Sequence, residues 1–198
     1  MKKAIIGAGG FADEVKAHMD DLTMKCFVND EYFTVNNQNI LPLSSFNPEE
    51  YEVLVAIGNP KIRKKIVSEL PFNTRYFSFI HQSAIILGND IEIGEGSIVC
   101  AGSIITTNCK IGKHSHLNLQ TTIGHDCSIG DFFTTAPGTK VSGNCKIGNL
   151  VYLGTNSSIR ERINICDEVV IGLNSGVVKN ITEKGIYAGL PAKKLLTK

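Results

Sequence analysis

The chain has 198 residues, with 20 lysines and arginines against 19 aspartates and glutamates, which gives a formal net charge of +1. This balance argues against a general nucleic-acid or membrane-surface binder, since such proteins carry a strongly basic surface. No apolar run approaches the ~20 residues that a helix needs to cross a bilayer. We therefore expect a cytoplasmic protein with no nucleic-acid or membrane partner.

The first eighty residues alternate strand and helix patterns. The stretch "KKAIIGAGGFADEVKAHM" predicts a strand, a glycine-rich turn and a helix, and "KCFVND" predicts a second strand. The stretch "EVLVAIGNPKIRKKIVSEL" repeats the strand–loop–helix plan, and "RYFSFI" predicts a closing strand. Residues 1–80 should therefore form a small, mainly parallel α/β domain.

The first loop of this domain resembles a phosphate-binding turn. Gly7, Gly9 and Ala12 match the loose G-x-G-x-x-G/A pattern, and Asp30 lies about 20 residues further on, where a ribose-binding acid would stand. The pattern is weak alone, because such loops also serve as plain tight turns. The domain is short for a dinucleotide-binding fold, so a nucleoside-diphosphate ligand suits it better than NAD. Gly58, in the second loop, should lie at the same edge of the sheet.

A six-residue repeat follows. Of the sixteen positions taken every sixth residue from Leu87 to Val177, fifteen are Leu, Ile or Val, and Thr135 is the exception. This period fits a short strand followed by a corner, with one inward aliphatic side chain per side. Three sides make an 18-residue triangular coil, and successive coils stack ~4.8 Å apart. We expect a parallel β-helix over 81–179, covered at one end by 1–80 and at the other by the tail 180–198.

Three of the six cysteines share the 18-residue interval. Cys109, Cys127 and Cys145 should therefore stack in one column inside the coils. We interpret them as small packing side chains. A metal or redox site is the alternative interpretation.

The corner "IGHDCSIGD" places His125 two residues after an inward aliphatic residue, where side chains should face outward. On an 18-residue coil, His125 stacks with Thr107, Gly143 and Glu161, so a residue without a side chain lies beside the imidazole. An imidazole suits proton transfer near neutral pH, and a neighbouring carboxylate can fix its tautomer. We interpret His125 as a general base and Asp126 as its partner. The alternative is an ordinary exposed pair.

The whole chain resembles the bacterial nucleotide-sugar acetyltransferases related to the bacillosamine and sialic-acid acetyltransferases, which belong to the hexapeptide-repeat proteins. The matching pieces are "IGAGGFADEV", "FVND", "VAIGNPKIRKKI", "LNLQTTIGHDCSIGDF", "GNCKIGNLVYLGTNSSI" and "YAGLPAKKL". The resemblance implies an α/β amino-terminal Rossmann-like domain (1–80), a left-handed parallel β-helix (81–179) and a short carboxy-terminal cap that contacts CoA (180–198).

The resemblance also implies an activity, which is transfer of acetyl from acetyl-CoA to the amine of a nucleotide-linked amino sugar, for cell-surface glycans. The implied acceptor is a 4-amino-4,6-dideoxy sugar, no metal is needed, and a homotrimer would form its active site between subunits. The catalytic residues that it implies are His125, Asp126 and Asn118. The implied sugar-nucleotide contacts are Gly9, Gly10, Phe11, Asn29, Asp30 and Gly58. The implied acetyl-CoA contacts are Thr134, Gly143, Thr155, Leu173 and Lys193.

Two positions depart from the family pattern, since relatives can carry histidines where this chain has Phe11 and Thr134. Three alternatives remain: an O-acetyltransferase acting on a sugar or serine hydroxyl, a zinc carbonic anhydrase of the same β-helix class, and a non-catalytic scaffold. A zinc site would have to use His114, His116 and His125. We expect His114 and His116 to be surface or site-wall residues.

Overall fold

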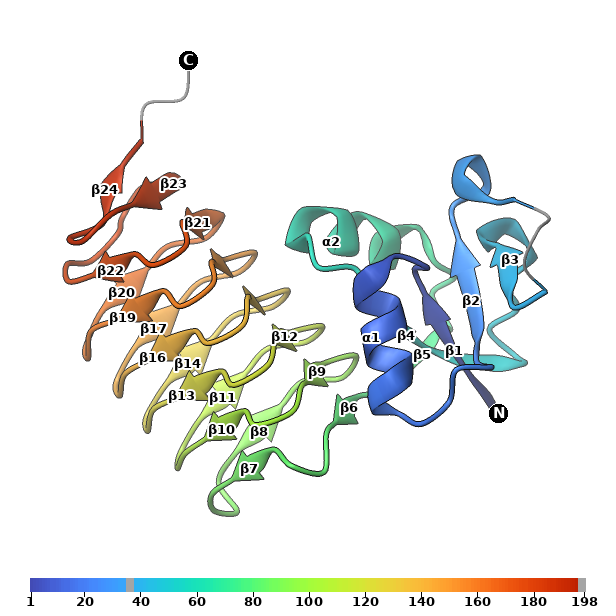
Figure 1. The fold of residues 1–198 in the computed structure, drawn as a ribbon, viewed down its shortest axis with the longest axis horizontal. Coiled ribbons are helices and arrows are strands. Elements are labelled where there is room, and N and C mark those ends of the chain that lie inside the picture. The colour runs from blue at the N-terminus through green and yellow to red at the C-terminus, as the bar shows by residue number, and fades with distance from the viewer. Residues whose placement is uncertain (35–37, 196–198) are drawn as a thin grey trace.

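The computed structural model describes residues 1–34 and 38–195. In Figure 1 an α/β unit, blue to cyan, lies beside a tall stack of short strands that runs from green to red. Among the described residues, no helix is long and apolar enough to span a membrane.

The α/β unit is built on a five-stranded parallel sheet in the order β3-β2-β1-β4-β5. Its strands are β1 (Lys2–Ile6), β2 (Lys25–Val28), β3 (Ile40–Pro42), β4 (Tyr51–Val55) and β5 (Arg75–Tyr76). The central strands β1 and β4 are apolar and buried on both faces, as parallel sheets between helices require. This confirms the predicted parallel α/β architecture. The predicted closing strand "RYFSFI" is wrong in part, because Arg75–Tyr76 form β5 whereas Phe79–Ile80 pair with Ile98–Val99 outside this sheet.

One helix covers each face of this sheet. Helix α1 (Gly10–His18) packs on the face that carries Ile5, and α2 (Pro60–Glu69) packs on the face that carries Ile6. Asn59 caps α2, since its side chain accepts hydrogen bonds from two main-chain N–H groups of the first turn. Two short 3-10 helices complete the unit, η1 (Asp30–Tyr32) and η2 (Leu43–Ser45).

The remaining strands form a left-handed parallel β-helix with three sheets, and the last strand alone among the described strands pairs antiparallel with its neighbour. The sheet nearest the α/β unit, here the facing sheet, contains β6 (Phe79–Ile80), β9 (Ile98–Val99), β12 (His116–Leu117), β15 (Thr134–Thr135), β18 (Tyr152–Leu153), β21 (Val169–Ile171), β23 (Gly185–Ala188) and β24 (Lys193–Lys194). The second sheet contains β7 (Ile85–Ile86), β10 (Ile104–Ile105), β13 (Thr122–Ile123), β16 (Lys140–Val141), β19 (Ser158–Ile159) and β22 (Gly176–Val177). The third sheet contains β8 (Glu92–Ile93), β11 (Lys110–Ile111), β14 (Ser128–Ile129), β17 (Lys146–Ile147) and β20 (Asn164–Ile165).

The 18-residue coil is confirmed by the strand register, which pairs Ile105 with Ile123 and Ile123 with Val141. The predicted inward positions from Val99 to Val177 are all buried. The predicted start of the series at Leu87 is wrong. Its neighbour Ile86 pairs with Ile105, 19 residues further on, while Leu87 is exposed. The first coil therefore contains one extra residue.

The corners share one backbone feature. A residue with left-handed φ recurs at every sixth position from Gly96 to Asn174, with φ values between 52° and 73°. Aspartate and asparagine tolerate this conformation better than most residues, and Asp126 is one of them, with φ 59°. The corner geometry therefore repeats whatever side chain the corner carries.

The cysteine column is confirmed as packing. Cys109, Cys127 and Cys145 are buried, and each thiol donates to a carbonyl 15 residues further along the chain, at 3.2–3.3 Å.

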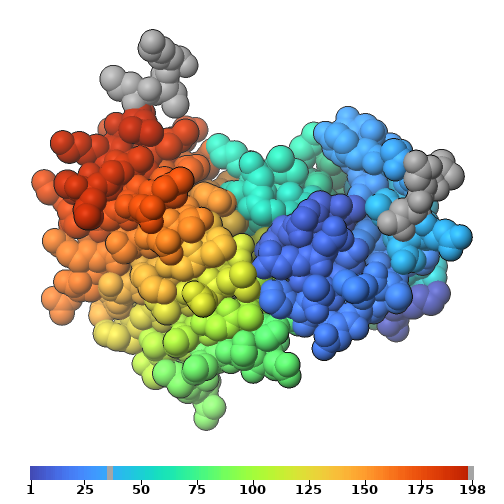
Figure 2. Space-filling view, viewed as in Figure 1, coloured from blue at the N-terminus to red at the C-terminus, as the bar shows by residue number. Residues whose placement is uncertain are grey.

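The α/β unit covers a side of the β-helix, so the expectation that residues 1–80 cover its end is wrong. Ile98 and Cys100, on the facing sheet, join Ala12 and Val15 of α1 in one buried cluster. Figure 2 shows this contact, with the blue atoms of the α/β unit against the green and yellow coils. At the far end, β23 pairs with β21, and Tyr187 packs against the β-helix core.

Candidate active site

The larger of two neighbouring cavities lies in the α/β unit and has a volume of about 670 Å³. It opens at the carboxyl ends of β1 and β4, where the strand order changes direction and where ligands bind in such sheets. The loops after these strands contribute Gly7, Ala8, Gly9, Ile57 and Gly58 to its wall. In Figure 2 it opens as a notch between the cyan α2 and the light-blue atoms near β2.

One end of this cavity is suited to phosphate. Helix α1 begins at Gly10 with Gly9 as an N-cap that supplies no side-chain hydrogen bond, so its first N–H groups remain available. A Cβ atom on Gly9, Gly10 or Gly58 would meet no atom within 4 Å, so the space beside these residues is open. Free N–H groups and the positive end of the helix dipole favour an anion there.

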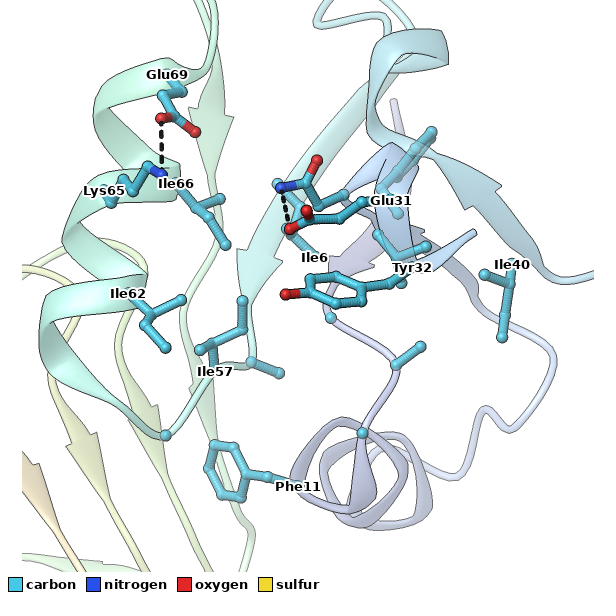
Figure 3. A pocket seen from close by; sticks show the side chains of 18 residues that line it. Ile6, Phe11, Glu31, Tyr32, Ile40, Ile57, Ile62, Lys65, Ile66 and Glu69 are labelled. Carbon is cyan, nitrogen blue, oxygen red and sulfur yellow. Dashed lines mark hydrogen bonds and ion pairs between the residues drawn. The ribbon is translucent and has the colours of Figure 1, made fainter. Parts of the chain in front are cut away.

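The other walls form an apolar slot with polar edges (Figure 3). Tyr32, from η1, is 73% exposed, and its ring points across the cavity toward Ile62 and Ile57. Asn29 donates to the Glu31 carboxylate at 3.3 Å. A flat aromatic group fits between such apolar walls, while polar side chains can bind its edges. Sequence reasoning missed Glu31, Tyr32 and Ile62, although a tyrosine two residues after "FVND" was a usable signal.

The structure brings most of the predicted sugar-nucleotide contacts together. Gly9, Phe11, Asn29 and Gly58 line this cavity, and Gly10 starts α1 beside it. Asp30 lies outside the lining. Its carboxylate accepts from the Ser44 N–H at 3.0 Å, and hydrogen bonds from Ser44 lower the pKa of Asp30 below its usual value.

A smaller cavity of about 240 Å³ lies between the two units. It shares Phe11 and Gly58 with the larger one, so the two are contiguous. The β-helix contributes His116, Asn118, Thr134, Thr135, Ala136, Pro137, Tyr152 and Thr155. The Asn118 side-chain oxygen accepts from the Leu119 N–H at 2.7 Å, which orients the amide at this wall.

His125 lies at the corner between the second and third sheets. Its Nδ1 is 2.6 Å from Asp126 Oδ2, and the other oxygen of Asp126 accepts from Asn108 at 2.6 Å. The hydrogen bonds from His125 and Asn108 hold the pKa of Asp126 below its usual value, so this carboxylate is ionised at neutral pH. An ionised partner places the proton of a neutral imidazole on Nδ1 and leaves the lone pair on Nε2.

Gly143 lies directly beside this lone pair. A Cβ atom built on Gly143 would stand 2.7 Å from His125 Nε2, so only glycine fits without moving the imidazole. The predicted contact between His125 and a residue without a side chain, one coil further along, is confirmed.

The predicted residues occupy two different corners of the β-helix. Asn118, Thr155 and Leu173 lie at the corner between the facing and second sheets, whereas His125 and Gly143 lie at the next corner. Leu173 is 69% exposed. The N–H of Asn174 donates to the Thr155 carbonyl, so Leu173 lies one coil beyond Thr155 at the same corner. The remaining acetyl-CoA candidates are Thr134, which is buried, and Lys193, which is exposed on β24.

Comparisons with known proteins identify the family of this chain. The family model described as the PglD N-terminal domain matches residues 2–70. WeeI from Acinetobacter baumannii is 30% identical, the match covers 98% of this chain and 100% of that one, and the TM-score is 0.87. The chain belongs to the hexapeptide-repeat family of nucleotide-sugar acetyltransferases.

Two further acetyltransferases have the same fold. The acetyltransferase domain of PglB from Neisseria gonorrhoeae is 28% identical, with a TM-score of 0.85 and coverage of 98% of this chain and 99% of that one. PerB from Caulobacter crescentus, solved with CoA and GDP-perosamine, is 22% identical, with a TM-score of 0.87 and coverage of 98% and 97%. The second resemblance shows the fold alone.

Two histidines of this acetyltransferase are buried at the contact between its units. His114 stacks on Phe132 and meets Tyr76 edge-on, so a surface position for His114 is wrong, while His116 lines the smaller cavity as a site-wall residue. Burial, with the neighbouring Arg63 cation, lowers the pKa of His114 to about 4 and lowers that of His116 well below its usual value.

The same cation opposes the zinc interpretation. Arg63 donates to His116 Nδ1 at 3.2 Å, so a metal ion at that imidazole would meet a positive charge and lose a ligand atom. His125 lies at a corner remote from the facing sheet that carries His116. Within one chain, these histidines do not converge.

Proposed function

We propose that this enzyme transfers the acetyl group of acetyl-CoA to the amine of a nucleotide-linked amino sugar, a 4-amino-4,6-dideoxy sugar. The observation that carries the proposal is the His125–Asp126 pair, which holds the imidazole by Nδ1 and turns Nε2 toward the bare backbone of Gly143. The nucleotide-sized cavity with its free helix N-terminus supports a sugar nucleotide as acceptor. The PglB domain has been solved with acetyl coenzyme A, and PerB with CoA and GDP-perosamine.

In the proposed reaction the amine attacks the thioester carbonyl directly. A C–N bond forms while His125 Nε2 accepts the proton of the amine, and Asp126 stabilises the resulting imidazolium. The Gly143 N–H donates to the oxyanion of the tetrahedral intermediate, an interaction of about 3 kcal/mol when such a donor is well placed. The C–S bond then breaks, and the proton on Nε2 passes to the leaving thiolate.

We propose that the active site forms between two copies of the chain in a homotrimer. Asn118 and His125 lie at different corners, so one copy would supply Asn118 from the acceptor side and its neighbour would supply His125. Closed rings use such head-to-tail contacts. CoA would lie in the groove between copies, against Gly143 of one copy and Thr155 and Leu173 of the other, with Thr134 and Lys193 as further contacts.

The two units then divide the work. Residues 1–80 hold the nucleotide, residues 81–179 carry the transfer chemistry, and residues 180–198 contact CoA. Gly9, Gly10, Phe11, Asn29, Asp30 and Gly58 are the proposed sugar-nucleotide contacts. We place the enzyme in the cytoplasm, because its proposed substrates are cytoplasmic metabolites.

The test is release of free thiol from acetyl-CoA with a panel of UDP-, dTDP- and GDP-linked amino sugars. Each amino sugar is paired with the corresponding hydroxyl sugar nucleotide. Thiol release that requires the amine supports N-acetylation. Release with the hydroxyl compounds alone would instead establish O-acetylation, and no release with any acceptor would contradict the proposal.

A further inference from the structure

Arg63 is a fully buried cation at the contact between the two units. It lies in the second turn of α2, and its relative exposure is 0%. Its guanidinium contacts seven acceptors, which are five main-chain carbonyls, one hydroxyl and one imidazole nitrogen. They are the carbonyls of Ile57, Gly58, His114, Phe132 and Phe133, Thr134 Oγ1 and His116 Nδ1, at 2.6–3.3 Å.

None of these seven acceptors is a carboxylate. A buried charge is costly unless fixed dipoles replace its hydration, and the planar fork of arginine can bind several carbonyls at once. Burial lowers the pKa of Arg63 to about 9, so the side chain stays protonated at neutral pH. The α/β unit supplies two of the five carbonyls and the β-helix supplies three, so the charge is fully solvated only when the two units keep their relative position.

The acceptors of Arg63 are also parts of the two cavity walls. Ile57 and Gly58 line the larger cavity in the α/β unit, while His116 and Thr134 line the smaller cavity on the β-helix. One side chain therefore ties the edge of the nucleotide cavity to the wall that carries Asn118. In addition, the hydrogen bond from Arg63 to His116 Nδ1 fixes the proton of that neutral imidazole on Nε2.

Other contacts already hold the units together. The apolar cluster of Ile98 and Cys100 with α1 joins them on one side, and Lys61 forms a 2.8 Å ion pair with Glu168 higher on the stack. Phe11, which lines both cavities, also packs against the His116 ring at a centroid distance of 5.3 Å. Arg63 differs from these contacts because its hydrogen bonds reach lining residues of both cavities.

We propose that Arg63 is a positioning residue for the acceptor. Its hydrogen bonds set the distance between the larger cavity, which holds the nucleotide, and the wall of the smaller cavity that carries Asn118. This inference rests on the proposed function, because it requires a ligand that spans both cavities. A misplacement of about 1 Å can cost on the order of 10²-fold in rate. A nucleoside diphosphate, which fills only the larger cavity, does not depend on this distance.

The experiment compares Arg63→Met and Arg63→Lys with the parent enzyme. For each we would measure KM for the amino-sugar nucleotide, KM for acetyl-CoA, kcat and thermal unfolding. Calorimetry without acetyl-CoA would measure the affinities for the amino-sugar nucleotide and for the matching nucleoside diphosphate. Arg75→Met, which removes an exposed arginine from β5, is the matched control and should behave as the parent does.

We expect Arg63→Met to raise the acceptor KM by about 30-fold or more, while the acetyl-CoA KM and the nucleoside-diphosphate affinity change by less than about threefold. Arg63→Lys keeps the charge but loses the fork, so its acceptor KM should rise by about 5–10-fold. Equal losses for every ligand, an unchanged acceptor KM, or failure of both variants to fold would each overturn the proposal.

The two hypotheses can fail separately. Acetyl transfer by the parent enzyme tests the proposed function. The role of Arg63 is tested by calorimetry on Arg63→Met, which should bind the sugar nucleotide more weakly than the parent does but the nucleoside diphosphate equally well. This comparison needs no catalysis.

Discussion

The His125 corner and the buried histidines of the facing sheet place the same side chain in opposite surroundings. The His125 side chain is 59% exposed and bonds to an ionised carboxylate, which leaves its Nε2 free beside Gly143. His114 and His116 are buried next to a guanidinium, which disfavours a second positive charge. The corner therefore presents an accessible ring nitrogen, as the proposed base requires, whereas the buried pair lies within the contact between the units.

The largest loss of activity is expected when the exposed imidazole of His125 is removed. His125→Ala should lower kcat by ~10²–10⁴-fold, the usual effect of losing a general base, and should leave CoA affinity nearly unchanged. Steady-state kinetics and CoA calorimetry would measure both quantities. His81→Ala, which removes a histidine outside both cavities, is the control. Equal turnover by His125→Ala and the parent would end the assignment of a base at this corner.

Adding one methyl group should be the next most damaging change at the corner. In Gly143→Ala the new Cβ would meet the His125 ring at 2.7–3.0 Å, so the imidazole must move away from its position. We expect kcat to fall by about 10²-fold with little change in the thermal unfolding midpoint. Glu161→Ala alters the exposed residue one coil further in the same column and should preserve activity. Full activity in Gly143→Ala would mean that the transfer does not occur between these two residues.

A smaller effect is expected from the carboxylate. Asn at position 126 tolerates the left-handed φ of 59° and can still accept one hydrogen bond, so the corner should keep its shape. Without a negative charge the imidazolium loses its counterion, and Asp126→Asn should lower kcat by about 10-fold. A loss as large as that of His125→Ala would instead mean that Asp126 contributes as much as the base itself.

The β-helix was predictable because its inward positions repeat every six residues, so the contact between His125 and Gly143 followed from an 18-residue count. The same rule failed in the first coil. Ile85, Ile86 and Leu87 are all aliphatic, and the period alone cannot tell which of them points inward. The extra residue is revealed by the strand register, in which Ile86 pairs with Ile105 and Ile80 with Val99, both 19 residues apart.

The side-on position of the α/β unit could not be predicted, because its contacts depend on residues that look ordinary in the sequence. Arg63 stands in "NPKIRKKI", where every neighbouring cation suggests a solvated helix face. Its burial arises only when the carbonyls of Phe132 and Phe133 reach it from a distant part of the chain. The burial of His114 and His116 follows from the same contact, so the sequence pattern carried no sign of it.

The buried histidines, His114 and His116, predict that the stability of the fold depends on pH. An unfolded histidine binds a proton below pH ~6.5. In the folded protein, burial and then the Arg63 cation lower the pKa of His114 to about 4. The carboxylates of Glu95 and Asp131 raise this pKa and so offset part of the shift. The unfolded state therefore binds more protons between pH 6.5 and 4, and the unfolding free energy falls as pH falls through this window. His114 alone contributes at most roughly 3 kcal/mol. His114→Phe keeps the aromatic stack on Phe132 and should flatten the slope measured by urea unfolding. It should not abolish the slope, because His116 remains, and an unchanged slope would mean that His114 does not lose its proton on folding.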